Sequence, residues 1–223
     1  MLNAAGVYGL GVVGQNFALN LASKNFQVCV GNRSPGRVGA TVIRAKAEGE
    51  YHVIGSFSPE NFIDKLKRPR KVVILVQAGK PVDATIEKLS KHMDPGDVII
   101  DGGNEWYPNS IRRFRLLEQK GINFVGMGIS GGEQGARSGP CLMAGGPREA
   151  YDLIKDILMK CAAKSAYGPC AGYVGPIGSG NYVQMIHNGI EYADLQLIAE
   201  IYDILRVSAI SQRRKLQRWK SLM

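Results

Sequence analysis

Four polar side chains recur at helical spacing late in the chain, and their types suit acid–base chemistry. They occupy positions i, i+3, i+4 and i+7 of a predicted helix: Gln184, His187, Asn188 and Glu191. This spacing places them on one face, with Tyr192 beside them. An imidazole and a carboxylate can transfer protons, and amides can orient hydroxyl groups. Although such a stripe is more often a solvated face, the mixture of groups beside Gly189, which permits close contact, favours a substrate site.

The beginning of the chain carries a glycine pattern suited to binding phosphates. It is a complete G-x-G-x-x-G, made of Gly9, Leu10, Gly11, Val12, Val13 and Gly14. The first glycine makes a tight turn, the second admits a pyrophosphate to the backbone, and the third lets a helix close on a strand. A glycine-rich turn without a ligand is the alternative. A strand predicted at 4–8 and a helix at 15–24, whose first amides can face phosphates, favour a dinucleotide site.

The end of the next predicted strand, 27–30, selects between the two nicotinamide coenzymes. An NAD site usually places a carboxylate there, which accepts from the ribose 2′-hydroxyl. This chain has Asn32, Arg33 and Ser34 instead. A guanidinium suits a 2′-phosphate and a carboxylate would repel it, so the sequence predicts NADP. A solvated turn arginine is the alternative.

Composition and charge exclude several other functions. Of the 223 residues, 45% are hydrophobic and 21% are charged, which is typical of a globular protein. Six basic residues and no acidic residue lie between Arg206 and Met223, so the net charge of +9 belongs mainly to this segment and does not predict nucleic-acid binding. The four cysteines form no C-x-x-C pair, which argues against a metal site and for a cytoplasmic protein. We expect neither a signal peptide nor a membrane span.

Strand and helix patterns alternate along most of the chain. Strands are predicted at 4–8, 27–30, 71–76, 97–101 and 123–129. Helices are predicted at 15–24, 37–48, 59–66, 81–93, 108–120, 147–164 and 180–206. This alternation predicts an α/β fold with a Rossmann-like, doubly wound, mostly parallel sheet, followed by the start of an all-α domain. The expected divisions are 1–178 for coenzyme binding, 179–210 for the helix, and 211–223 for a basic tail.

Three further loops are candidates for ligand contact. Val76, Gln77 and Ala78 close one strand, and Asp101-Gly102-Gly103-Asn104 closes the next, at the edge where open α/β sheets bind ligands. The stretch from Ser130 to Gly146 is rich in glycine, which makes poor core and poor helix. It is equally consistent with a packed structural loop and with an amide nest around Ser130. Residues 168–179 are expected to be a connector.

Together these motifs closely resemble the decarboxylating 6-phosphogluconate dehydrogenases over residues 3–210. The most specific motifs are Asp101-Gly102-Gly103-Asn104, the 130–146 stretch, and Ile186-His187-Asn188-Gly189-Ile190-Glu191-Tyr192. The wider β-hydroxyacid dehydrogenase group shares the glycine fingerprint but lacks the Asn-Gly-Ile-Glu-Tyr run. The resemblance therefore favours the decarboxylating enzymes over that group.

The resemblance implies a reaction and a set of ligands. NADP takes hydride from C3 of 6-phosphogluconate, the 3-keto acid loses carbon dioxide, and an enediol is protonated to ribulose 5-phosphate, without a metal. The implied coenzyme residues are Gly9 to Gly14, Asn32, Arg33, Ser34, Val76, Gln77, Ala78 and Asn104. The implied substrate residues are Asn104, Ser130, Gly131, Gly132, His187, Asn188 and Tyr192. Glu191 would protonate the enediol carbon.

The sequence also departs from the family. Gln184 stands where the family has the lysine base that takes the 3-hydroxyl proton, and Gln77 also replaces a lysine. An amide has no useful basicity near neutral pH. Family members continue into a large helical domain that supplies phosphate ligands and most of a homodimer interface. Two hypotheses therefore remain, an NADP-dependent dehydrogenase and a non-catalytic NADP-binding fragment or pseudoenzyme.

Overall fold

The computed structural model describes residues 2–220, with side chains up to residue 210. The chain forms two compact units, Met1–Gln184 and Met185–Met223. The boundary between them falls six residues after the one expected at 178. The basic side chains expected at 211–223 lie outside the part whose side chains are described.

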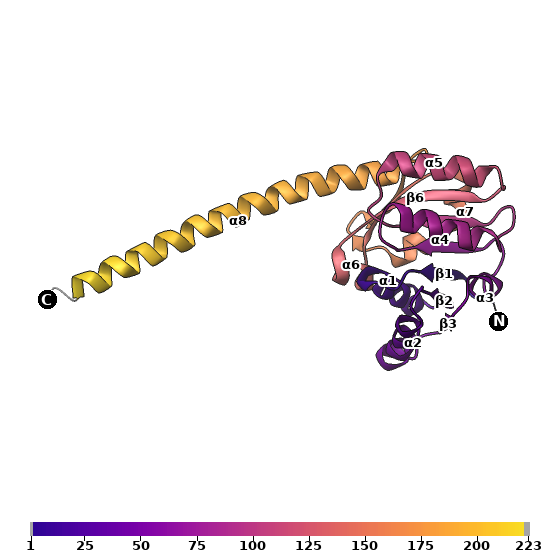
Figure 1. The fold of residues 1–223 in the computed structure, drawn as a ribbon, viewed down its shortest axis with the longest axis horizontal. Helices are drawn as coiled ribbons and strands as arrows, with labels where there is room; N and C mark the ends of the chain where they lie inside the picture. The colour runs from indigo at the N-terminus through magenta and orange to yellow at the C-terminus, as the bar shows by residue number, and fades with distance from the viewer. Residues whose placement is uncertain (1, 221–223) are drawn as a thin grey trace. The chain divides into compact units, whose positions relative to one another are not determined.

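An eight-stranded sheet forms the centre of the first unit (Figure 1). Its strands are β1 (Ala5–Tyr8), β2 (Val28–Gly31), β3 (Val53–Ser56), β4 (Lys71–Ile74), β5 (Val98–Asp101), β6 (Asn123–Ser130), β7 (Cys141–Gly145) and β10 (Ala171–Gly175). They lie in the order β10-β7-β6-β5-β4-β1-β2-β3, and every pair is parallel except β6–β7. A separate two-stranded ladder joins β8 (Lys164–Ser165) to β9 (Gly168–Pro169). The predicted doubly wound, mostly parallel sheet is confirmed.

Helices cover both faces of this sheet. They are α1 (Val12–Ser23), α2 (Pro35–Gly49), α3 (Pro59–Asp64), α4 (Lys80–Ser90), α5 (Tyr107–Glu118), α6 (Gly132–Ser138) and α7 (Arg148–Cys161), and α8 (Ser179–Lys220) follows them. One buried cluster contains apolar residues of α1, α2 and α7, and a second contains those of α3, α4 and α5. Within β4, Val73 joins the first cluster while Val72 and Ile74 join the second. Strands with both faces covered read as continuous apolar runs, which explains why the sequence predicts β4 clearly.

The glycine-rich stretch 130–146 is more regular than expected, because it forms α6 and β7 rather than an irregular loop. Its glycines serve close packing. A Cβ on Gly145 would lie 2.2 Å from Ser179 Oγ, and one on Gly126 of β6 would lie 2.1 Å from Asn181 Oδ1. A Cβ on Gly180 of α8 would lie 2.2 Å from the Gly126 carbonyl oxygen. Bare backbone therefore lets the first turn of α8 sit against β6 and β7.

Three further features differ from what the sequence predicted. Residues 168–179 are not a plain connector, because β10 within them pairs with β7 and extends the sheet. Strand β3 was not predicted; only Val53 and Ser56 of its four residues are buried, so it lacks a continuous apolar run. Helix α8 continues through Gly189 to Lys220, beyond the predicted end at 206. Among the described residues, no helix is both long and apolar enough to cross a membrane.

The glycine fingerprint gives a direct test of this packing. A Cβ on Gly14 would lie 1.9 Å from the Gly9 carbonyl oxygen, so Gly14→Ala should force α1 away from β1. We expect it to cost at least about 2–3 kcal/mol of unfolding free energy. Gly11→Ala is the matched control, because nothing lies within 4 Å of a Cβ there. Thermal unfolding followed by circular dichroism should show a lower Tm for Gly14→Ala alone; equal Tm values would contradict this account of the turn.

Candidate functional site

The candidate site lies at the carboxyl edge of the sheet, where the strand order reverses. Strands β1 and β4 are neighbours, but the chain proceeds from β1 to β2 on one side and from β4 to β5 on the other. Loops that leave neighbouring strands in opposite directions open a crevice between them, and open α/β sheets bind ligands there. The loops after β1, β2, β4 and β5, together with the first turn of α1, contain all the expected coenzyme residues.

The fingerprint glycines form a turn that is tight on one side and open on the other. Gly9 has φ 103°, which favours glycine, and its amide donates to the Gly31 carbonyl oxygen at 2.9 Å. A Cβ at Gly9 would lie 2.4 Å from the Leu75 carbonyl oxygen. By contrast, no atom lies within 4 Å of where a Cβ on Gly11 would be. Helix α1 begins at the next residue and has no acidic side chain in its first turn. The arrangement leaves room for an anion at the helix N-terminus.

The loop after β2 is tied to the fingerprint by Asn32. Its Oδ1 accepts from the Leu10 amide at 3.0 Å, and its Nδ2 donates to the Ser34 carbonyl oxygen at 3.2 Å. Arg33 and Ser34 are exposed. Arg37, which the sequence analysis did not single out, donates from Nη1 to the Leu10 carbonyl oxygen at 3.3 Å. Asn32 thus shapes the loop, while two arginines bring positive charge to it.

A buried arginine connects the loops after β4 and β5. Arg113 of α5 has a side chain that is 1% exposed, and its Nη1 donates to Asp101 Oδ2 at 3.1 Å and to Glu105 Oε2 at 2.6 Å. Its Nε donates to Asp83 Oδ1 at 2.7 Å. Its Nη2 donates to the Gly79 carbonyl oxygen at 2.9 Å, and the Gly79 amide donates to Glu105 Oε2 at 2.8 Å. The peptide groups on either side of Gly79 Cα are therefore both held. We refer to these five residues as the Arg113 cluster.

The carboxylates of the Arg113 cluster differ in their electrostatics. Burial raises the pKa of Asp101 to about 6, although Arg113 and the Gly103 amide act in the opposite direction. Burial also opposes ionisation of Glu105, but hydrogen bonds from Asn109, Gly79 and Arg113 outweigh it and lower its pKa. Burial of Arg113 is likewise outweighed by its carboxylate partners, which raise its pKa. The guanidinium stays charged because its partners surround it.

The expected substrate residues of the first unit lie at the same edge. Asn104 is exposed just beyond β5, with Gly102 donating from its amide to the Ile74 carbonyl oxygen at 3.0 Å. Ser130 ends the neighbouring strand β6 and is half-buried. Gly131 and Gly132 follow it, both exposed and both with positive φ. Val76, Gln77 and Ala78 lead from β4 to Gly79, and the latter two are exposed.

Gln184 is buried, unlike a residue on a solvated helix face. It is 4% exposed, and a Cβ on Gly128 of β6 would lie 2.8 Å from Gln184 Cβ. Gly128 precedes Ser130 by two residues, so Gln184 packs on the strand that ends at the expected substrate loop. Asn181, one turn earlier, was not anticipated. It accepts from Ser110 Oγ at 2.8 Å and donates to the Gly103 carbonyl oxygen at 3.4 Å.

The remaining residues of the predicted stripe belong to the second unit. His187 Nδ1 lies 3.2 Å from Asn188 Oδ1 and 3.8 Å from Glu191 Oε2. These contacts confirm that the three residues share one face of α8. His187, Glu191 and Tyr192 are exposed.

Polar contacts also fix helix α6, which follows the Ser130 loop. Arg137 donates from Nε to Glu48 Oε2 at 2.9 Å and from Nη2 to Tyr51 Oη at 3.3 Å. Asn16 of α1 donates to Glu133 Oε1 at 3.5 Å and accepts from Arg44 at 2.9 Å. The fingerprint helix and the helix of the expected substrate loop are therefore joined by side chains.

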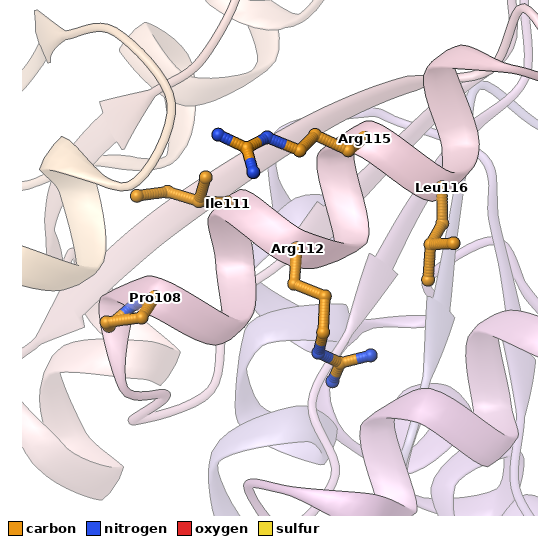
Figure 2. A pocket seen from close by; sticks show the side chains of 5 residues that line it. All are labelled: Pro108, Ile111, Arg112, Arg115 and Leu116. Carbon is orange, nitrogen blue, oxygen red and sulfur yellow. The ribbon is translucent and has the colours of Figure 1, made fainter.

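A separate hollow lies on the outer surface of α5. Figure 2 shows it lined by Pro108, Ile111, Arg112, Arg115 and Leu116. None of the expected site residues lines this hollow. In the part of the chain that the structure describes, no group of three or more His, Cys, Asp or Glu side chains could hold a metal ion.

Comparisons with known families agree with this geometry. The family described as the NAD binding domain of 6-phosphogluconate dehydrogenase matches residues 4–175. The family described as 6-phosphogluconate dehydrogenase, C-terminal domain, matches residues 180–220. This second match includes residues 211–220, which the sequence analysis placed in a separate tail.

Individual relatives are similar over most of this chain. It is 56% identical over 205 residues to the chloroplastic decarboxylating 6-phosphogluconate dehydrogenase 1 of Arabidopsis thaliana. That match covers 92% of this chain and 42% of the relative. The decarboxylating 6-phosphogluconate dehydrogenase 1 of Saccharomyces cerevisiae is 53% identical over 201 residues. That match covers 90% of this chain and 41% of the relative. This chain thus spans about two fifths of the length of these relatives.

Solved structures show the same relation. The 6-phosphogluconate dehydrogenase of Plasmodium falciparum, described in apo form and in complexes with its cofactor NADP+ and its substrate 6-phosphogluconate, has a TM-score of 0.85 and 51% identity. The match covers 89% of this chain and 42% of that one. A 3-hydroxyisobutyrate dehydrogenase of Salmonella typhimurium, at 21% identity and TM-score 0.68, shares the fold. The family match over most of the chain, together with these relatives, shows that the chain belongs to the 6-phosphogluconate dehydrogenase family.

Proposed function

We propose that this chain binds NADP at the carboxyl edge of its sheet and forms the coenzyme-binding part of a decarboxylating 6-phosphogluconate dehydrogenase. The observation that carries the proposal is the fingerprint turn. A Cβ on Gly9 or Gly14 would collide with backbone atoms, whereas a Cβ on Gly11 would have no atom within 4 Å. A bare turn would need no such opening, whereas a pyrophosphate on the first amides of α1 does.

The residues present fit NADP better than NAD. The loop after β2 carries exposed Arg33 and Ser34, with Arg37 nearby, and has no carboxylate to oppose a 2′-phosphate. In this proposal the coenzyme is held by Gly9 to Gly14, Asn32, Arg33, Ser34, Val76, Gln77, Ala78 and Asn104. When bound, NADP supplies the acceptor for a hydride.

The proposed substrate is 6-phosphogluconate, and the residues proposed to hold it are those that the resemblance implies. They are Asn104, Ser130, Gly131, Gly132, His187, Asn188 and Tyr192. Glu191 is proposed to protonate the enediol carbon that remains after carbon dioxide leaves. In support, Asn104 and Ser130 follow neighbouring strands of one sheet, and His187, Asn188 and Glu191 share one face of α8.

A second candidate function is NADP binding without catalysis, and Gln184 favours it. Oxidation of an alcohol requires the hydroxyl proton to leave as the hydride departs. An amide can accept a hydrogen bond from the hydroxyl but cannot take its proton near neutral pH. A lysine at this position, 4% exposed, would have a pKa lowered by desolvation and would serve as a base.

We further propose that the protein is a homo-oligomer, a dimer as the resemblance implies, and that it resides in the cytoplasm. The apolar side chains of α8 support the first part, because several of them are more than half exposed. The four free cysteines are compatible with a reducing compartment. Some relatives are named as chloroplastic, so a plastid is the alternative location.

The coenzyme preference can be tested by reversing the charge of Arg33. We expect the wild-type chain to bind NADP more tightly than NAD, and Arg33→Glu to weaken NADP binding by about 10- to 100-fold while leaving NAD nearly unchanged, since a charged hydrogen bond to the 2′-phosphate is lost. Lys46→Glu, an exposed charge reversal on α2, the helix that follows the Arg33 loop, is the control. Calorimetric titration measures the affinities of all three chains for both coenzymes, and equal wild-type affinities for NADP and NAD would refute the assignment.

The role of position 184 can be tested in a chimera that continues from Arg206 into the helical domain of a relative. There, Gln184→Lys should raise the rate of NADPH production from 6-phosphogluconate by about 10²–10⁴, the usual contribution of a general base. Coenzyme affinity should stay the same. Gln184→Met, which can neither accept the proton nor hydrogen-bond the hydroxyl, is the control. Equal rates for glutamine and lysine would show that another group takes the proton.

The exposed face of α8 predicts self-association. Its apolar residues are 54–67% exposed: Leu195, Ile198, Ile201, Tyr202 and Leu205. Covering such a surface is favourable, so light scattering should show dimers or larger species that Ile198→Glu shifts toward monomer. Gln196→Glu adds the same charge to the same helix and should have little effect. A wild-type monomer at high concentration would argue against this interface.

A further inference from the structure

Arg113 holds together the two loops that follow β4 and β5, and its position suggests more than a structural role. We infer that Arg113 is a positioning residue for the nicotinamide half of NADP. The inference rests on the proposed function, because it takes NADP as the ligand. It concerns residues to which the sequence analysis assigned no part: Asp83, Glu105 and Arg113.

Arg113 contacts groups that shape the loop after β4. Its Nη1 and Nη2 reach Glu105 and the Gly79 carbonyl oxygen at 2.6 and 2.9 Å. Gly79 has φ 86°, a conformation that other residues rarely adopt, and its amide is held by Glu105. The exposed Gln77 and Ala78 immediately precede it. Loss of the guanidinium would therefore release the segment expected to touch the coenzyme.

The same side chain also fixes the loop after β5. Arg113 pairs with Asp101, which is fully buried at the end of that strand, and Asp101 Oδ1 accepts from the Gly103 amide at 3.2 Å. Asn104 follows directly. A lysine ammonium is a compact charge and cannot replace a planar fork that reaches acceptors in several directions. Without the fork, two buried carboxylates would lose their counter-charge.

The topology of the sheet indicates which half of NADP the Arg113 loops contact. The fingerprint and the Arg33 loop belong to the β1–β3 side of the reversal point, which is the side proposed to bind the adenosine 2′-phosphate. The loops held by Arg113 belong to the β4–β6 side. In doubly wound folds each half of the sheet serves one nucleotide of a dinucleotide. Arg113 should therefore affect the nicotinamide half and leave the adenosine half alone.

The chain also contains a matched control at the opposite edge of the same two strands. Arg70 precedes β4, and its side chain is 11% exposed. It donates from Nη1 to Asp97 Oδ2 at 2.9 Å and to Asp94 Oδ2 at 2.5 Å, joining the segments before β4 and β5. Arg70→Lys removes a similarly buried guanidinium that also joins two segments, without touching the carboxyl edge.

The experiment is calorimetric titration of the full chain with NADP and with adenosine 2′,5′-bisphosphate, below the Tm of each variant. We expect Arg113→Lys to weaken NADP binding at least about tenfold while the bisphosphate affinity changes less than about twofold. Arg70→Lys should change both affinities less than about twofold, even if its Tm falls equally. Only a positioning role separates the two ligands in this way.

Several results would overturn the inference. If Arg113→Lys binds NADP as Arg70→Lys does, or loses both ligands equally, Arg113 is structural only. If Arg113→Lys does not fold, Glu105→Gln decides by the same criteria. Its one carbonyl oxygen cannot replace both carboxylate oxygens, because Oε2 accepts from the Gly79 amide and Arg113 while Oε1 accepts from Asn109. A wild-type chain that binds neither ligand refutes the proposed function itself, which is distinguishable from a wild-type chain that binds both.

Discussion

The pairing of one buried guanidinium with carboxylates is the interaction on which the candidate site depends. A charge as deeply buried as Arg113 is tolerated only when its donors are satisfied, and here Asp83, Asp101, Glu105 and the Gly79 carbonyl oxygen satisfy them. These acceptors come from the segments that leave two neighbouring strands. The requirement to pair the charge therefore also sets the shape of the loops at the carboxyl edge.

Close backbone approach is the second constraint, and glycine provides it at two places. At the fingerprint, the absence of a Cβ on Gly14 lets α1 begin against β1. At β6 and β7, Gly126 and Gly145 admit the first turn of α8, so that Gln184 packs on the strand ending at Ser130. Coenzyme loops and substrate loop are in this way built on one sheet, and side chains linking α1 to α6 connect them.

Much of the fold follows from the sequence because the central parallel strands, such as β4 and β5, are continuous apolar runs and the helices have a clear period. The fingerprint and the stripe on α8 were likewise predicted from spacing. Strands β7 and β10 were not predicted, because glycines are typical of loops. Only the structure shows that these glycines make room for the first turn of α8. Arg113 and Glu105 were not predicted either, because charged residues on helices and in loops are normally exposed, and only the tertiary contacts show that these two meet. Single residues without a period carry no such signal.

The most direct test of NADP binding at this edge is amide hydrogen exchange of the full chain with and without the coenzyme. NADP should slow exchange at the four loops of the carboxyl edge, in residues 9–14, 32–34, 76–79 and 102–104. Exchange at the opposite edge, around Asp94 and Asp97, should be unchanged. Protection confined to other segments, or absent at saturating NADP, would contradict the account.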